Sequence, residues 1–410
     1  MLSDQKREYD ELSLELDYDF EDFRSAHLEP LTELTLSLQE WLQTFGRSYF
    51  VAQRLKRKPQ ILRKLRRFSV RLTQLQDIGG CRIIVENNSD VDDLISFVRQ
   101  NLRTSKDLKV NRETDYRQFG RDDTGYRAFH FVISTKSGVK LELQLRSRIQ
   151  HYWSESIERT SVVYGHRLKE QEGDGEVIEY FKAFSNVLHR IENSLSISSD
   201  DEIDLERRRQ LAESIISQST SDGVGLSSHV NEGVVKTLSE TEKSSSTSLN
   251  NWVLVFDWKD GNFVTWEIVG RDPKYAVETY SRYEREYPEE DKYEVVLIGS
   301  SDISTVRQTH SHYFGIEHHN SALEQMETSI IGLSKRNNMD VGARRILSVL
   351  KRRRYWGKNT IKIDTLKNHF CNNIASFNVS LEDLKKRGFV IGTDPVSLDI
   401  KMNKQIAEYV

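Results

Sequence analysis

Residues 124–148 read TGYRAFHFVISTKSGVKLELQLRSR, and their alternation of polar and apolar side chains predicts two β-strands. Gly125 permits a tight turn before the first strand, on which Tyr126 and His130 share one face. On the second strand Glu142, Gln144 and Arg146 share one face, and leucines at alternating positions form the other. One sheet is therefore expected to present these five polar side chains to a single cleft.

The residues before this pair supply positive charge and a further carboxylate. Residues 54–67 read RLKRKPQILRKLRR, and the segment 54–71 holds nine basic residues and no acidic one. Helical spacing buries its apolar residues on one face and brings the following basic side chains to or near a second: Arg54, Lys56, Arg57 and Lys64. Residues 75–85 read LQDIGGCRIIV, in which CRIIV at 81–85 predicts a core strand and Asp77 stands just ahead of it.

The order of elements predicts the fold class and a division of the chain. A strand, a helix over 90–102 and two further strands, with helices at both ends, indicate an α+β fold with a mixed sheet flanked by helices. We expect N-terminal helices over 1–48 that pack on a central α+β domain over 49–216, and a serine-rich linker over 217–250. A small α+β domain over 251–318 and a helical, winged-helix-like unit over 319–410 follow.

Composition limits the setting of the protein. The chain has 410 residues and a net charge of −4, which hides the basic segment 54–71. Its two cysteines, Cys81 and Cys371, form no metal-binding pair in the sequence, so a reducing cytoplasm is expected. No stretch of about 18 apolar residues occurs, and we expect no membrane partner.

The chemistry these residues permit is phosphate transfer. Neither of the common glycine-rich phosphate loops is present, so a polyphosphate must be held by arginine and lysine side chains. Transfer of a phosphoryl or pyrophosphoryl group then needs Mg²⁺ on one or two carboxylates. Asp77 and Glu142 are the carboxylates placed at strand ends for that purpose.

The motifs RLKRKPQILRKL, LQDIGGCRIIV, TGYRAFHFV and LELQLRSRIQHYW resemble, in order, those of the synthetase domain of the RelA/SpoT alarmone family. The resemblance covers about residues 45–190. It implies a nucleotidyltransferase-like fold and transfer of pyrophosphate from ATP to the 3′-hydroxyl of a guanine nucleotide. No His-Asp dipeptide occurs, so the hydrolase domain of that family is not expected.

The resemblance also implies roles for individual residues. Basic residues would bind the ATP phosphates, Asp77 and Glu142 would hold Mg²⁺, and Glu142 would activate the acceptor hydroxyl with Gln144 beside it. Tyr126 would stack on the acceptor base. The remaining assignments put Arg54, Lys56, Arg57, Lys64 and Arg82 on the ATP phosphates and His130 and Arg146 on the acceptor.

Three positions depart from the family pattern: Gln60, Thr124 and the pair Ile157-Glu158. They stand where many members have serine, asparagine and a Glu-His pair, and they leave the acceptor open. Candidates are GTP or GDP, an adenine nucleotide, and the 3′-terminal adenosine of tRNA. A tRNA would need basic tracks outside the pocket, and the candidate tracks are Arg63, Arg66, Arg67 and Arg71, and Lys351, Arg352, Arg353 and Arg354.

Residues 250–316 resemble the C-terminal domain of fused toxic synthetases of the CapRel type, through NWVLVFDWKDG, AVETYSRYEREY and VVLIGSSDI. That resemblance implies a built-in antitoxin, a role in phage defence and a phage protein as trigger. Tyr280 and Tyr283 would be its autoinhibitory tyrosines, although both could equally pack on their own sheet. Two alternatives stay open: a housekeeping (p)ppGpp synthetase with effector-sensing domains, and an RNA- or DNA-binding regulator with a degenerate synthetase fold.

Overall fold

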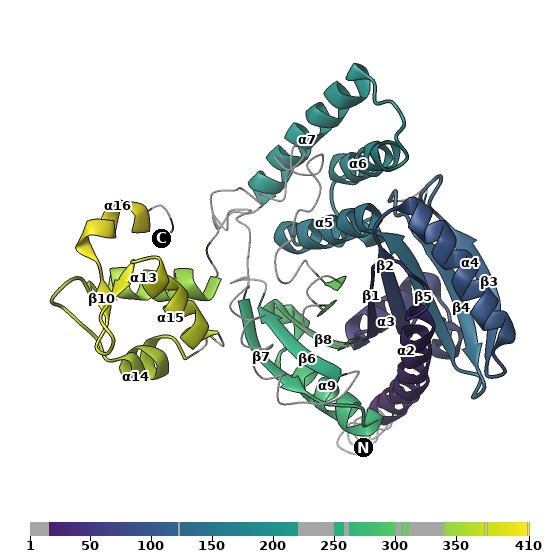
Figure 1. The fold of residues 1–410 in the computed structure, drawn as a ribbon, viewed down its shortest axis with the longest axis horizontal. Helices are drawn as coiled ribbons and strands as arrows, with labels where there is room; N and C mark the ends of the chain where they lie inside the picture. Colours follow the sequence, from purple (N-terminus) through teal and green to yellow (C-terminus); the bar gives the residue numbers. More distant parts are fainter. Residues whose placement is uncertain are drawn as a thin grey trace, which may run out of the picture.

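The central feature of the molecule is a mixed sheet of eight strands in the order β3-β4-β5-β2-β1-β8-β6-β7 (Figure 1). The computed structural model describes residues 16–121, 124–219, 250–257, 262–300, 305–306, 309–310, 339, 341–372, 374, 376–407 and 409. Helices flank the sheet, as the sequence predicted for an α+β fold. Only β2 and β5 pair in parallel; the other neighbours are antiparallel.

The elements have the following bounds. The strands of the large sheet are β1 Tyr49–Leu55, β2 Gly79–Val85, β3 Leu108–Asp115, β4 Phe129–Thr135, β5 Lys140–Ser147, β6 Asn250–Asp257, β7 Asn262–Ile268 and β8 Tyr293–Ser300. The helices packed with it are α2 Leu28–Leu42, α3 Lys58–Phe68, α4 Asn88–Thr104, α5 Arg148–Tyr164, α6 Gly175–Glu192, α7 Ser199–Ser219 and α9 Pro273–Glu286.

One face of the sheet is apolar and is covered by α2 and α4. The leucines of β5 at 141, 143 and 145 are fully buried there, as their alternation predicted, and pack with the apolar sides of α2 and α4. The N-cap of α4 is Asn87, whose side chain accepts from the backbone N–H of Asp90, so the helix extends two residues beyond the predicted 90–102 at each end. Burial of this face fixes the register of β5 and so directs its polar residues to the opposite face.

A second core supports the opposite face. It forms between α5, α6 and α7, with Trp153, Phe181 and Phe184 among its buried aromatic side chains. The indole N–H of Trp153 donates to the backbone carbonyl of Phe181 at 2.8 Å, so the packing satisfies its polar atom.

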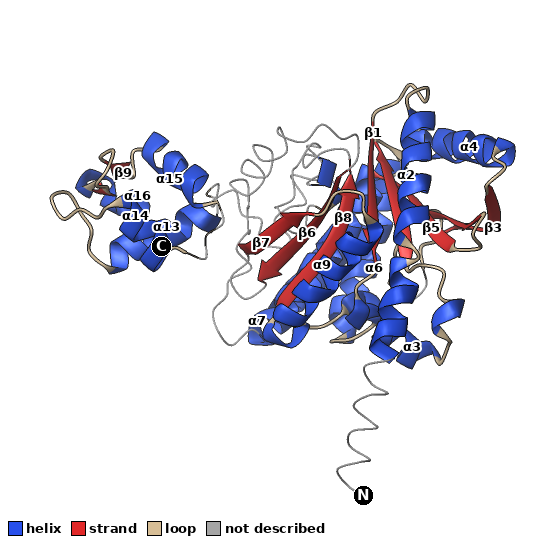
Figure 2. Ribbon diagram, turned by 90° about the horizontal axis from the view of Figure 1, so that it is seen from below, coloured by secondary structure: helices blue, strands red, loops and turns tan. Residues whose placement is uncertain are grey.

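The strands after the serine-rich segment continue the same sheet. Strands β6 and β7 pair antiparallel, and β8 pairs with β1 from Ala52↔Ser300 to Leu55↔Leu297 (Figure 2). Gln53 of β1 donates to Asn251 of β6 at 2.8 Å inside the protein. An apolar cluster spanning α3, β6, β8 and α9 joins the two parts. The strands at 250–300 and the strands at 49–147 therefore form one continuous sheet.

The C-terminal residues build a separate core. Helix α13 (Val341–Arg352), α14 (Ile363–Thr365) with a π-helical turn (Leu366–Phe370), and α15 (Phe377–Lys386) precede the hairpin of β9 (Val390–Ile391) and β10 (Ser397–Leu398). Short helices, η5 (Ile400–Met402) and α16 (Asn403–Ile406), follow. Helices followed by a small hairpin match the winged-helix-like expectation. The first part of the predicted unit, residues 319–338, and nearly all of the predicted linker lie outside the described residues.

No helix in the described ranges has the length and apolar character needed to cross a membrane.

Candidate active site

A cavity of about 480 Å³ opens on the polar face of the sheet, between α3 and the β3–β4 connection. Its floor follows the strand register. One row across the sheet is Arg112, Val132, Glu142, Gly80 and Arg54, and the next is Thr114, His130, Gln144, Arg82 and Ala52. Residues in register point to the same side of a sheet, so five strands contribute to one surface.

Five polar side chains form a closed ring of hydrogen bonds in this cavity. Arg146 donates through Nη2 to the hydroxyl of Tyr126 (2.6 Å) and to Oε1 of Gln144 (2.7 Å). The Tyr126 hydroxyl contacts Nε2 of His130 at 2.7 Å. His130 Nδ1 lies 2.9 Å from Glu142 Oε1, and Gln144 Nε2 donates to Glu142 Oε2 at 2.7 Å. Both oxygens of the Glu142 carboxylate are therefore held in place.

The ring shifts the ionisation of its members. Burial alone would raise the pKa of Glu142, but His130, Gln144 and Lys56 hold it well below its usual range. Burial lowers the pKa of His130, and the neighbouring Tyr126 and Glu142 outweigh this and raise it to about 9. Burial raises the pKa of Tyr126, and Arg146 and His130 lower it to about 8. At neutral pH Glu142 is an anion beside a cationic His130.

Asp77 lies at the same cavity and is bound by two lysines. Lys56 and Lys64 donate to its Oδ2 at 2.5 and 2.7 Å. Burial would raise the pKa of Asp77, and these lysines lower it. Its Oδ1 is buried and has no hydrogen-bond partner within the described part of the chain. A buried carboxylate oxygen without a partner fits a cation ligand, so Asp77 suits Mg²⁺, and Glu142 lines the same cavity.

Most of the predicted phosphate-binding residues of the basic segment line the cavity, and one instead contacts β8. Arg54, Lys56 and Lys64 line the cavity, together with Arg63 and Arg67. Arg57 does not: it precedes α3 in extended conformation and forms an ion pair with Glu294 of β8 at 3.1 Å. The sequence prediction placed Arg54, Lys56 and Arg57 on one helix with Lys64, whereas Arg54 lies on β1 and α3 begins only at Lys58.

Arg82 lines the cavity as expected but is held by other groups. Its Nη1 donates to the backbone carbonyl of Thr309 at 2.8 Å and lies 3.6 Å from Glu155. Burial lowers the pKa of Arg82 to about 10, with nearby Arg146 adding to this effect and Glu155 opposing it.

The two candidate autoinhibitory tyrosines lie away from the cavity lining. Tyr280 is fully buried and its ring lies 4.2 Å from the guanidinium carbon of Arg24. Tyr283 donates to Glu267 of β7 at 3.1 Å. Tyr283 thus packs within its own part of the chain, whereas Tyr280 packs where the two parts meet, against Arg24 of the N-terminal part.

Several cavity residues were missed from the sequence. Arg112, Thr114 and Tyr116 line it from β3 and the turn that follows, Arg121 lines it from a loop, and Lys169 lines it from a short 3-10 helix, η2 (Leu168–Glu170). The period-two spacing of the first three was the available signal, but their segment is too polar to be recognised as a strand. Tyr116 meets Tyr126 and His130 edge-on, with ring centroids 6.2 and 5.4 Å apart.

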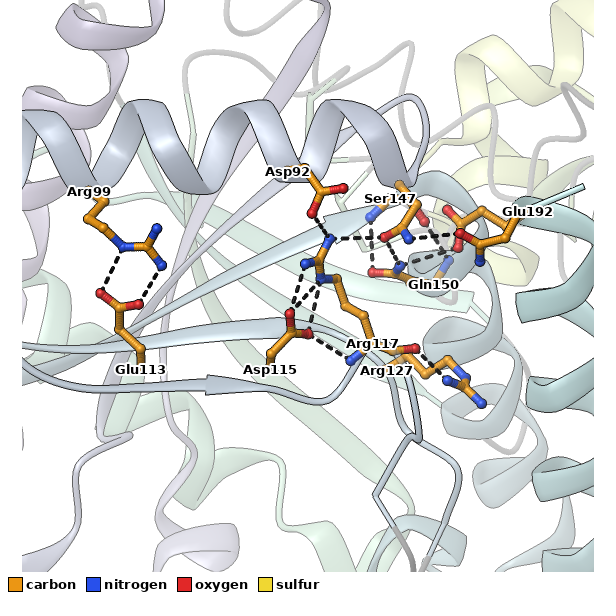
Figure 3. Close-up of polar contacts among 11 residues, drawn as sticks. Asp92, Arg99, Glu113, Asp115, Arg117, Arg127, Ser147, Gln150 and Glu192 are labelled. Atoms are coloured by element: carbon orange, nitrogen blue, oxygen red, sulfur yellow. Dashed lines mark hydrogen bonds and ion pairs between the residues drawn. The ribbon is translucent and has the colours of Figure 1, made fainter.

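An ion-pair network holds the turn that carries these aromatic residues (Figure 3). Arg117 pairs with Asp115 at 2.8 Å and with Asp92 of α4 at 2.7 Å. Arg127 donates to the backbone carbonyls of Arg117 and, at 2.6 Å, Gln118. The alternation that directs Tyr126 into the cavity therefore directs Arg127 to the network behind it.

Residues 53–168 match the family model described as "Region found in RelA / SpoT proteins". We call residues 53–168 the RelA/SpoT region, after the family model that they match. It contains the basic segment, Asp77 and all five members of the hydrogen-bonded ring. No curated protein matches the chain.

Solved structures similar to the chain include three alarmone-related proteins. Small alarmone synthetase 1 from Bacillus subtilis, bound to its product pppGpp, is 25% identical, with 43% of this chain and 92% of that one covered and a TM-score of 0.33. A GTP pyrophosphokinase family protein from Streptococcus pneumoniae is 21% identical (48% and 97% covered, TM-score 0.35). Small alarmone synthetase 2 from Bacillus subtilis is 22% identical (43% and 95% covered, TM-score 0.36).

Proposed function

We propose that the RelA/SpoT region is an ATP-dependent pyrophosphokinase acting on the 3′-hydroxyl of a nucleotide. The observation that carries the proposal is the hydrogen-bonded ring, which fixes the Glu142 carboxylate in the cavity that Asp77 and the basic residues of α3 also line. A fixed anionic carboxylate is suited to orienting or deprotonating a hydroxyl, and clustered cations are suited to a polyphosphate.

In the proposed reaction the residues divide their work. Arg54, Lys56 and Lys64 bind the ATP phosphates. The oxygen of the acceptor hydroxyl attacks the β-phosphorus of ATP, and Glu142 takes the proton of that hydroxyl. The bond between that phosphorus and the α–β bridging oxygen breaks, and AMP leaves. Mg²⁺, held by Asp77 and Glu142 when bound, would neutralise charge on the phosphates.

Acceptor binding is assigned to the side chains that line the cavity from β3 and the β3–β4 connection. Tyr126 is 8% exposed, and the Arg146 guanidinium carbon lies 4.8 Å from its ring centroid. Tyr116 adds a more accessible ring beside it. These aromatic groups suit a nucleobase, and Arg112 and Arg121 suit the phosphates of GTP, of GDP or of the end of a tRNA.

We further propose that residues 251–318 restrain the RelA/SpoT region, as in a fused toxin and antitoxin. Support comes from carboxylates of residues 251–318 that form ion pairs with basic residues of the RelA/SpoT region. Glu289 pairs with Arg63 at 2.8 Å and with Arg167 at 3.1 Å, and Glu294 pairs with Arg57. His310 lines the cavity directly. The role in phage defence and the phage protein as trigger rest on the sequence resemblance.

The activity is tested by incubating the full chain with ATP labelled in its β-phosphate, together with GTP, GDP or deacylated tRNA. Label on GTP or GDP would favour the housekeeping alternative, and label on tRNA would favour the toxin. Absence of label on every acceptor, with the restraint released as described next, would refute the pyrophosphokinase and favour a degenerate fold.

Restraint is tested best with point variants. Removing β8 by truncation would expose the edge of β1, which invites aggregation. The double variant Glu289→Gln and Glu294→Gln leaves the sheet intact and should raise transfer activity and arrest growth. Glu286→Gln, an exposed position on α9, is the matched control. Unchanged activity in the double variant would contradict the restraint.

A further inference from the structure

The C-terminal unit differs sharply in charge from the rest of the chain. Residues 341–410 contain 14 lysine and arginine residues against 6 aspartate and glutamate residues, a formal charge of +8. The chain as a whole carries −4. A unit with its own core and this excess charge is suited to a polyanionic partner.

Contacts within the fold bring basic residues from separate segments together. The Arg353 guanidinium carbon lies 3.7 Å from the Phe370 ring centroid, which places it one helical turn from Lys367. Gly357 donates to the carbonyl of Leu398 at 3.0 Å and abuts Ile400, so Lys358 and Lys401 lie at the same edge. We call this set the basic surface: Arg352, Arg353, Arg354, Lys358, Lys367 and Lys401.

The members of the basic surface are all exposed and form no ion pair among the described residues. By contrast, Lys385 and Arg387 near α15 pair with Glu382 and Asp383 at 3.2 and 2.7 Å. An ordinary solvated helix face mixes charges in that second way. Exposed cations that have no ion-pair partner in the described part of the chain repel one another, and an external polyanion would reduce that repulsion.

We propose that the basic surface binds the phosphodiester backbone of a nucleic acid, without reading its bases. In winged-helix proteins the second helix of the helix-turn-helix pair enters the major groove, and in this fold that position belongs to α15. The carboxylates of Glu382 and Asp383 on α15 would repel phosphates there. The basic surface lies on the segments after α13, before α15 and after β10, so backbone contact explains it better than base recognition.

The test measures binding of the full chain, without ATP, to a labelled 20-nucleotide RNA hairpin and to duplex DNA of equal charge. The triple variant Arg352→Gln, Lys358→Gln, Lys367→Gln is compared with the control triple Lys385→Gln, Lys386→Gln, Arg387→Gln, which removes the same charge. The first should weaken binding at least about tenfold and flatten the slope of log K against log salt by about 2–3, as expected when three phosphate contacts are lost. The control should stay close to the parent chain.

Binding of either nucleic acid supports the proposal, and the tighter binding of RNA or of DNA identifies which of them supplies the phosphodiester backbone. No binding to either, or equal weakening by both triples, would overturn it. Thermal unfolding of each variant shows that the unit still folds. Because the measurement needs no transfer reaction, its result does not depend on whether the RelA/SpoT region is a pyrophosphokinase.

Discussion

His130 Nδ1 lies 2.9 Å from Glu142 Oε1, and the other nitrogen of the same ring contacts the Tyr126 hydroxyl at 2.7 Å. One imidazole thus links the carboxylate proposed to handle the acceptor proton to the tyrosine proposed to bind the acceptor base. His130 is placed to orient Glu142 rather than to touch ATP.

Replacing Glu142 by glutamine should lower kcat by about 100-fold to 10,000-fold, because the side chain keeps its shape but accepts no proton. His130→Ala should lower kcat less, by about tenfold to 100-fold, because the carboxylate remains but loses its orientation. In His130→Ala the KM for ATP should change little, because His130 is not assigned to the ATP phosphates or to Mg²⁺. Steady-state transfer of labelled pyrophosphate measures both.

Thermal unfolding controls for loss of structure in these two variants. A Glu142→Gln protein that retains the parent kcat would remove Glu142 from the proton transfer. An increase of KM alone in His130→Ala would make His130 a binding residue instead.

Burial raises the pKa of Tyr126, but Arg146 and His130 lower it by a larger amount, to about 8. Tyr126 should therefore ionise well below the pH at which an ordinary tyrosine does. A tyrosine whose folded pKa is depressed stabilises the fold above its unfolded value of about 10, and this contribution is lost as pH falls through about 8. Absorbance at the tyrosinate band should therefore show one early step among the 16 tyrosines. The step should vanish in Tyr126→Phe, and its persistence there would assign it to another residue.

The polar face of β5 could be predicted because one buried face determines where every alternate side chain points. The leucines at 141, 143 and 145 provided that information, and Glu142, Gln144 and Arg146 followed. What periodicity does not give is which strands are neighbours. Arg82 reaches Gln144 through parallel pairing of β2 and β5, strands about 60 residues apart, and only the motif resemblance put them in one site.

Arg57 and the sheet junction show the limits of local patterns. A helical ladder predicts directions only inside the helix, and Arg57 precedes α3, where its extended backbone turns the side chain toward Glu294. Pairing of β1 with β8 joins residues about 250 positions apart, and nothing in the spacing of either strand encodes its partner.

Gly80 lies in register between Glu142 and Arg54, so no side chain separates the proposed base from the proposed phosphate ligand. A Cβ added there would meet only the carbonyl of Glu142, at 3.4 Å. Gly80→Leu should therefore fold but fill the cavity floor, and ATP binding should weaken by at least about tenfold. Gly80→Ala should bind nearly as the parent does. Calorimetric titration with MgATP distinguishes the two, and normal binding by Gly80→Leu would place the donor elsewhere.

Gly299 of β8 marks where the two parts of the sheet meet most closely. A Cβ there would lie 2.3 Å from Asn251 Oδ1, 2.5 Å from Gln53 Cγ and 2.6 Å from Gln53 Nε2. These side chains are buried and hydrogen-bonded to each other, so they cannot move aside without losing that bond. Gly299→Ala should destabilise the protein by about 1–3 kcal/mol.

Gly175→Ala is the matched control, because a Cβ at this helix start meets nothing within 4 Å, and alanine there should be neutral or slightly stabilising. Denaturant unfolding of both variants measures the difference. Equal stability would mean that β8 does not pair with β1 in solution as it does here, and the restraint proposed through Glu289 and Glu294 would lose its structural basis.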